Sequence, residues 1–274
     1  MSAPGAALPL GARASAFTRA RRSIEDCLVV TGRNLRHFVR QPQLLIFSTI
    51  QPIMFVLLFA FVFGGAIEGS LPGGVSYVDF LLPGIFIQAA AFRSTQTAVA
   101  LAEDLDRGVI DRFRSMPIAR AAVLVGRTAA DLLRNVFVTL LMAGVGYLIG
   151  FRFRAGPFDA VGAVLVVLAF GFALSWIFTF VGLAVRGAEA AQSAGFVAIF
   201  PLVFASSVFV PVETMPAGLE WFASVSPVTA SVDAARALSI GGEVLDPLLR
   251  ALAWFAGILL VVVPLCVWRY RRIG

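Results

Sequence analysis

The chain has 274 residues, of which 59% are hydrophobic and 14% are charged, against the roughly 25% charged residues that are usual in soluble domains. This composition excludes an ordinary soluble domain and indicates a membrane protein. The net charge is +6, but the arginines lie between long apolar runs and not on one basic face, which argues against nucleic-acid binding.

The first predicted element is a basic amphipathic helix over residues 15–41. Apolar residues recur there at three- and four-residue spacing, with arginines between them. This pattern is typical of a helix that lies on the inner membrane surface, and the alternative is an ordinary solvated helix. Pro42 then forces a break before the chain enters the bilayer.

Six apolar runs are long enough to cross a membrane, since a hydrocarbon core of about 30 Å needs about 20 helical residues. The runs lie near residues 44–64, 79–101, 122–149, 160–184, 190–210 and 248–268. Arginines concentrate before the first run, between the second and third runs, and after the last. The positive-inside rule therefore places both termini in the cytoplasm of one all-α, multi-pass domain that covers residues 1–274.

The second span contains polar residues at Gln88, Arg93 and Gln96. An arginine in the middle of a bilayer costs about 2.5 to 3.5 kcal/mol on insertion scales, so it usually faces a cavity or a partner. These residues either line a translocation path, or the helix extends beyond the bilayer and Arg93 snorkels to water.

Between the second and third spans, residues 103–117 combine acids and arginines in one short segment. In helical projection its apolar residues gather on one side, and Glu103 and Arg107 are four residues apart, which predicts an ion-paired amphipathic helix. Pro117 ends this helix. The segment is either a topogenic loop, or a docking surface whose balanced charges meet a partner.

Three charged residues follow at the start of the third span. Arg127, Asp131 and Arg134 are spaced four and three residues apart, so that the carboxylate can pair with either arginine. We interpret them as a structural ion cluster.

The segment 211–247 is too apolar for a free loop and too interrupted by proline for a span. Its aromatic residues Trp221 and Phe222 either belong to an external cap or anchor the chain at the membrane interface.

The residues of three segments resemble one known family. The pattern EDLxxGxxDRxRSMPI at 103–118 with AxxLxGR at 121–127, RQP at 40–42, and PVETMPAGLEWFASVSPVTASVDAARAL at 211–238 are similar to ABC-2 type transporter permeases of the daunorubicin-resistance type. The segments occur in the same order, and the resemblance covers nearly the whole chain.

The resemblance implies a type V exporter-like fold with six transmembrane helices, a cytoplasmic coupling helix at 103–117 and external re-entrant helices within 211–247. It also implies that the coupling helix docks on a separate ATP-binding subunit. The residues that match the family pattern, and that we expect at this contact, are Glu103, Gly108, Asp111, Arg112, Arg114 and Pro117.

The expected partners are two ATP-binding subunits, a second permease that is identical or paralogous, and the lipid bilayer, in a bacterial inner membrane. The chain lacks lysine, which excludes a Walker-type phosphate loop, so ATP and Mg²⁺ are expected on the partner subunit. No nucleic acid, metal, bound cofactor or catalytic residue is expected on this chain, since two distant cysteines and one histidine suggest no site.

The sequence leaves two classes of exported cargo and one other transport mechanism as alternatives. Dense phenylalanines in the fourth and fifth spans either line a lipophilic pocket or face lipid, at Phe170, Phe172, Phe178, Phe180, Phe196, Phe200, Phe204 and Phe209. A lipophilic drug or lipid suits such a lining, and a polysaccharide or glycoconjugate is the alternative for an exporter. An ion-coupled carrier is a further alternative, but it should have intramembrane carboxylates, and Asp131 is the only acid well inside a predicted span.

Overall fold

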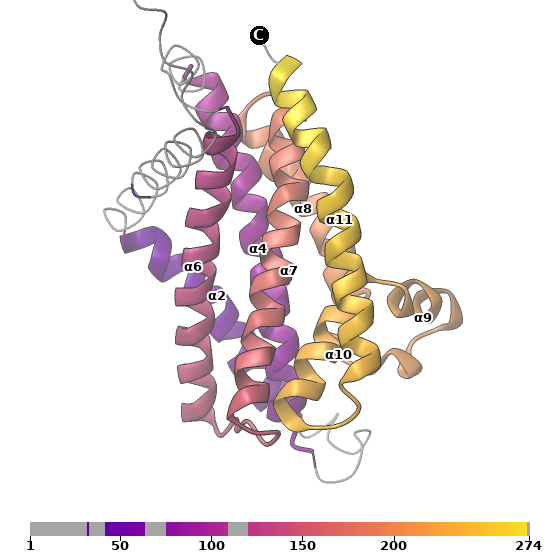
Figure 1. Cartoon of the computed structure of the whole chain (residues 1–274). Coiled ribbons are helices and arrows are strands. Elements are labelled where there is room, and N and C mark those ends of the chain that lie inside the picture. Colours follow the sequence, from indigo (N-terminus) through magenta and orange to yellow (C-terminus); the bar gives the residue numbers. More distant parts are fainter. Residues whose placement is uncertain (1–31, 33–41, 64–74, 109–119, 273–274) are drawn as a thin grey trace, which may run out of the picture.

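The computed structural model describes residues 32, 42–63, 75–108 and 120–272, with the backbone alone in 42–49 and 120–131. All secondary structure in these ranges is helical (Figure 1). The α-helices are α2 (Pro42–Leu58), α4 (Tyr77–Asp106), α6 (Arg120–Ile149), α7 (Pro157–Ala184), α8 (Ala188–Phe204), α9 (Ala217–Ser224), α10 (Pro227–Ile240) and α11 (Leu245–Arg272). A π-helix, η1 (Phe59–Phe63), continues α2, and a 3-10 turn, η3 (Val212–Thr214), precedes α9.

The described part of the chain contains three helices that are long and apolar enough to cross a membrane: residues Leu132–Ile149 of α6, and the whole of α7 and α11. The apolar stretches Ile50–Val62 and Ala188–Phe204 are shorter. The predicted second, third, fourth and sixth spans each lie within one long helix.

The predicted fifth span differs at its end, because α8 ends at Phe204 and not near residue 210. Beyond this point Ser206 donates a hydrogen bond to the Val203 carbonyl, and the Ser207 amide donates to the Thr229 hydroxyl on α10. The Val203 carbonyl and the Ser207 amide, which a continued helix would use in its own hydrogen bonds, therefore bond to side-chain hydroxyls here.

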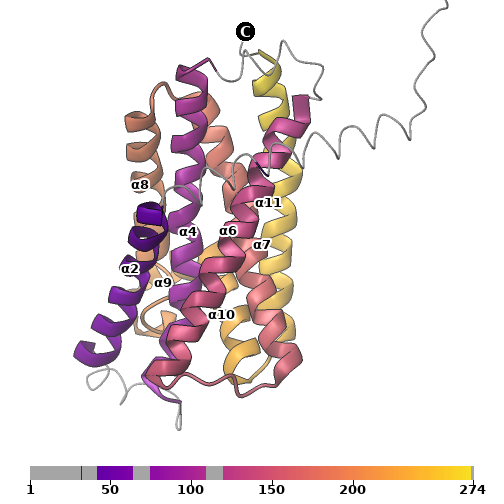
Figure 2. The same cartoon turned by 90° about the vertical axis from the view of Figure 1, so that its left-hand side faces the viewer.

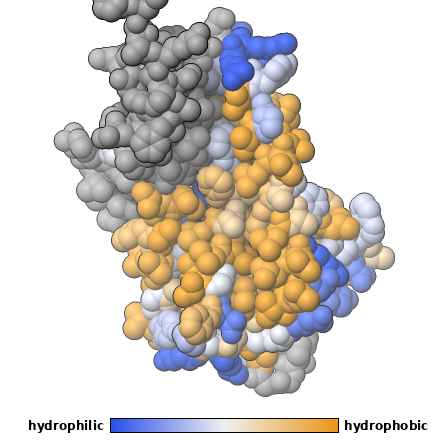
Figure 3. All heavy atoms as spheres, in the orientation of Figure 1, coloured by the Kyte–Doolittle hydropathy of each residue, from blue (hydrophilic) through white to orange (hydrophobic). Residues whose placement is uncertain are grey.

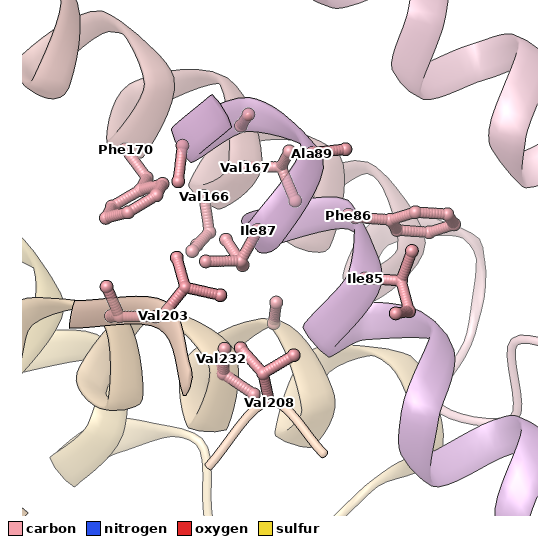
Figure 4. Packing of buried hydrophobic residues seen from close by; sticks show 14 of the residues in the cluster. Ile85, Phe86, Ile87, Ala89, Val166, Val167, Phe170, Val203, Val208 and Val232 are labelled. Carbon is pink, nitrogen blue, oxygen red and sulfur yellow. The ribbon is translucent and has the colours of Figure 1, made fainter. Parts of the chain in front are cut away.

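α4 lies at the centre of the bundle, where it contacts α7, α8, α10, α6 and α2 (Figures 1 and 2). Figure 4 shows the core between α4, α7, α8 and α10, in which Ile87 of α4 lies near Val166 and Val203. α4 and α7 approach closely at Gly182, where a Cβ atom would lie 2.7 Å from the Ala98 carbonyl oxygen. Only glycine permits this approach.

The two ends of the bundle are distinct. The upper end in Figure 1 holds the end of α4, the start of α6 and the carboxyl end of α11, which contains Arg269, Arg271 and Arg272. The lower end holds the start of α4, the loop between α6 and α7, and α10. Between the ends, Figure 3 shows an apolar surface over the middle of this face, with hydrophilic residues at the top of α11 and around the bottom.

The structure modifies two predicted segments and leaves a third outside the described residues. Residues Glu103–Asp106 form the last turn of α4, which is continuous, and not the start of a separate helix. The segment 211–247 contains η3, α9 and α10, of which α10 packs into the bundle against α7 and α11. The predicted amphipathic helix at 15–41 lies outside the described residues, except for Gly32.

Candidate functional site

The three polar residues of the second span do not share one environment. Gln88 and Arg93 are buried inside the bundle, whereas Gln96 is exposed. Arg93 has 8% of its surface exposed, so its guanidinium does not reach the outside of the bundle. It is held by α6, because its Nε donates a 2.7 Å hydrogen bond to the Asn135 Oδ1.

Asn135 connects three helices at this level. Its amide nitrogen lies against Gly171 of α7, where an added Cβ atom would be 2.9 Å away. One residue beyond Arg93, the Ser94 hydroxyl donates to the carbonyls of Ala90 and Gly171. The middle of α4 is therefore tied by polar contacts to both α6 and α7.

The predicted ion cluster is described only at Arg134. The backbone of Arg127 and Asp131 lies in α6, but their side chains are outside the described residues. Arg134 is half-buried and places a positive charge close to Arg93.

Gln96 lies on a face of α4 that is lined by aromatic rings. Phe92, one turn earlier on the same face, contacts Phe196 of α8 with ring centroids 5.8 Å apart. Thr95 lies against Gly195 of α8 at the same level.

From this point a continuous series of phenylalanine rings follows α8 to the lower part of α2. Successive centroids are 4.3 to 6.3 Å apart, and most of these pairs are stacked. We call this series the phenylalanine ladder; its members are Phe92, Phe196, Phe200, Phe204, Phe209, Phe59 and Phe55.

The ladder is accessible along α8. Phe196, Phe200 and Phe204 recur every four residues and form one stripe on this helix, with 51%, 47% and 37% of their surface exposed. Phe209 is buried and connects the stripe to Phe59. Phe170 and Phe178 instead belong to the buried core, so only four of the eight phenylalanines predicted for a pocket lie in the ladder.

The lower end of the bundle is fastened by two charged groups of residues. Asp79 at the start of α4 is buried and accepts from Arg154 Nη2 at 2.7 Å and from the Arg152 amide at 3.3 Å. Both arginines lie in the loop between α6 and α7, so this contact fixes the loop to α4.

The second group surrounds Arg236 of α10. Arg236 donates to the carbonyls of Phe80 and Ser207, and its guanidinium lies 3.7 Å from the centroid of the Phe80 ring. Asp233 accepts from both Arg236 and the Ser207 hydroxyl. Burial lowers the pKa of Arg236 to about 10, so the side chain stays charged at neutral pH and holds α10 to α4.

The residues predicted for the external cap lie on α9, which projects from the bundle beside α10 and α11 in Figure 1. Trp221 is 70% exposed and Phe222 is 39% exposed. Their rings therefore remain available for lipid or for another chain.

Two residues of the predicted coupling contact are described, and both lie at the upper end of α4. Glu103 pairs with Arg107 at 3.2 Å, and Gly108 has a φ of 64°. The remaining four residues, Asp111, Arg112, Arg114 and Pro117, lie outside the described residues.

Among the described residues there is no group of three or more histidine, cysteine or acidic side chains that could hold a metal ion. Cys266 is buried and its thiol donates to the Trp176 carbonyl.

Comparisons with known proteins support one family. Residues 25–239 match the family described as ABC-2 type transporter. The chain is 34% identical over 250 residues to "Daunorubicin resistance ABC transporter permease protein DrrB1" of Streptomyces coeruleorubidus, an alignment that covers 91% of this chain and 87% of the relative.

Two relatives come from Mycobacterium tuberculosis. "Probable doxorubicin resistance ABC transporter permease protein DrrC" is 30% identical over 260 residues, which cover 92% of this chain and 91% of the relative. "Doxorubicin resistance ABC transporter permease protein DrrB" is 30% identical over 186 residues, which cover 64% of each chain.

Proposed function

Because the chain belongs to the ABC-2 type transporter family, we propose that it is the membrane permease of an ATP-driven exporter for a lipophilic drug or lipid. The names of the relatives favour a drug as the cargo, since they refer to resistance to daunorubicin or doxorubicin. Transport by this chain requires no chemistry of its own, only a path and a coupling contact.

The observation that best supports this function is the phenylalanine ladder. Aromatic rings stack on one another with about 0.5 to 1.5 kcal/mol beyond the burial of their area, so a planar drug finds a similar environment at each ring. A series of equivalent weak sites allows a lipophilic molecule to move without being trapped at any one of them. Sugar polymers would need polar groups between the rings, and the exposed stripe on α8 consists of phenylalanine.

The ladder has a direction relative to the membrane. Its first ring, Phe92, lies near the middle of α4, and the series continues toward the lower end of the bundle. We place the upper end in the cytoplasm by the positive-inside rule, because the arginines of α11 lie there. The ladder then leads outward through the outer half of the membrane, and Gln96 lies one turn before it on the cytoplasmic side.

In this arrangement α2 with η1, α4, α6, α7, α8 and α11 are the six spans, and both termini are cytoplasmic. α4 is not among the three helices that are apolar enough to cross a membrane by composition, but five neighbouring helices contact it and bury its polar residues Gln88 and Arg93. α9 and α10 lie on the outer side, where Trp221 and Phe222 cap the exit or rest at the lipid interface.

Energy comes from a separate ATP-binding subunit that docks on residues 103–117. The contact residues are Glu103, Gly108, Asp111, Arg112, Arg114 and Pro117, and ATP with Mg²⁺ is bound by the partner. A second permease, identical or paralogous, faces the exposed stripe of α8, so that two chains and two ATP-binding subunits enclose the path.

The ladder is tested by equilibrium binding of doxorubicin to the purified transporter in nanodiscs, followed by the fluorescence anisotropy of the drug. Replacing Phe200 and Phe204 together by alanine removes two stacking partners and should raise the Kd about tenfold. Phe158→Ala is the control, because Phe158 is also highly exposed but lies outside the ladder. Equal affinity in wild type and the double variant would refute the ladder as the drug site.

The coupling contact is tested by co-purification with the cognate ATP-binding subunit. Glu103→Arg reverses a charge at the end of α4 and should reduce recovery of that subunit while the permease still folds. Asp246→Arg reverses an exposed charge at the opposite end of the bundle and should have no effect. If both variants retain the subunit equally, residues 103–117 only set topology.

A further inference from the structure

A buried polar contact lies in the middle of the bundle, away from the phenylalanine ladder. Arg93 of α4 and Asn135 of α6 have 8% and 4% of their surface exposed, and their 2.7 Å hydrogen bond uses only the Nε of the guanidinium. Both residues lie near the midpoints of their helices, far from either end of the bundle.

The rest of the Arg93 guanidinium is not satisfied within the described part of the chain. Its two terminal nitrogens, Nη1 and Nη2, are fully buried and have no hydrogen-bond partner there. The Thr139 hydroxyl is likewise buried without a partner in that part of the chain, and it lies one turn from Asn135 on the same face of α6. α4 and α6 therefore each carry a buried donor that has no partner in the described part of the chain.

The described side chains of this region carry positive charge. A guanidinium in a protein remains protonated, and burying an unpaired charge is far more costly than burying a neutral polar group. Arg134 adds a second positive charge nearby. Ordered water can satisfy the hydrogen bonds of such groups, but it cannot compensate their charge.

We propose that the two terminal nitrogens of Arg93 and the hydroxyl of Thr139 bind a small inorganic anion of the chloride class between α4 and α6. Charge-assisted hydrogen bonds from a guanidinium are among the strongest that a protein offers to an anion. A monatomic anion needs space only beside these donors, whereas a phosphate or lipid headgroup would have to pass between closely packed helices.

The bound anion holds α4 and α6 together. α4 ends, and α6 begins, at the two sides of the segment that precedes Arg120, so the site ties together the two helices that flank this segment. Occupancy stabilises their contact and adds the binding free energy of the anion to the stability of the folded chain.

The test is the thermal unfolding of the complete transporter in nanodiscs, with chloride replaced by gluconate at constant ionic strength. The melting temperature of the wild type should rise by about 3 °C as chloride increases from far below the Kd to about ten times the Kd. Arg93→Gln should abolish this rise. Arg250→Gln, which alters an exposed pair on α11, should retain it.

Thr139→Val is a second variant, which tests the site by the same chloride titration if Arg93→Gln does not fold. Loss of one hydrogen bond to the anion should move the midpoint of the chloride titration about tenfold higher without abolishing the rise. Bromide can replace chloride, and anomalous scattering from crystals grown in bromide should place it between α4 and α6.

The proposal is overturned if the wild-type melting temperature is independent of chloride. Such a result would mean that water, or the carboxylate of Asp131 one turn before Asn135, binds the Arg93 guanidinium in place of chloride. If Asp131 does so, Asp131→Asn would lower the melting temperature at every chloride concentration. A chloride effect that is unchanged in both Arg93→Gln and Thr139→Val would also overturn it.

Discussion

Single residues decide how closely the helices approach. Gly182→Ala places a Cβ atom 2.7 Å from the Ala98 carbonyl oxygen and should force α7 away from α4, at a cost of about 1 to 3 kcal/mol. The loss is measured as a lower melting temperature in detergent. Gly144→Ala is the matched control, because no atom lies within 4 Å of its Cβ position. Equal melting temperatures for the two variants would contradict the close approach.

The ion pair between Arg154 and Asp79 at the lower end predicts that a second mutation restores part of the stability lost by the first. Arg154→Gln leaves the Asp79 carboxylate buried without its cation and should destabilise the chain by about 2 kcal/mol. Asp79→Asn in the same chain removes the buried charge and should restore about half of that loss. Thermal unfolding of the two single variants and the double variant measures the coupling, and strictly additive losses would show that the two side chains do not interact.

At the scale of elements, the turn at Gly108 ends α4. Gly108 has a positive φ, which costs other residues about 1 to 2 kcal/mol, and no atom lies within 4 Å of its Cβ position. Gly108→Val should therefore disturb the turn at the end of α4 without a clash and lower drug-stimulated ATPase activity about fivefold. Gly108→Asn should retain more activity, because asparagine tolerates this conformation. Equal activity of wild type and Gly108→Val would show that the turn does not matter for coupling.

The elements were largely predictable from the sequence because apolar length depends on composition alone. The fourth span and α7 differ by only a few residues at the start, and the sixth span lies wholly within α11. The end of α8 was not predictable, because the apolar run continues past Phe204. The Ser206 hydroxyl donates back to the Val203 carbonyl, and the Ser207 amide donates to Thr229, which lies in a later part of the chain.

The candidate site was predictable only in part. Arg93 was conspicuous in an apolar run, but its partner Asn135 is an ordinary polar residue whose importance depends on how α4 and α6 are aligned. Phe196, Phe200 and Phe204 repeat every four residues, which is visible in the sequence. Phe92 joins them because α4 lies beside α8, and Phe55 and Phe59 join them through Phe209, beyond the end of α8; no local pattern contains that information.

At the scale of the whole molecule, the chain consists of a central polar helix enclosed by apolar ones, with an aromatic ladder on one side and an arginine-rich end. In the proposed function, such a chain guides a lipophilic molecule while a separate ATP-binding subunit supplies the energy. Export by this account therefore requires the ladder and the ATP-binding subunit together.

The most direct measurement of this claim is ATP-dependent accumulation of doxorubicin in inverted membrane vesicles that contain the chain and its ATP-binding subunit. Wild type and Phe158→Ala should accumulate the drug. The variant with alanine at Phe200 and Phe204 should lose about tenfold of this accumulation, at unchanged amounts of assembled complex. Undiminished accumulation by that variant would contradict the ladder as the path, and absence of ATP-dependent accumulation by the wild type would contradict drug export.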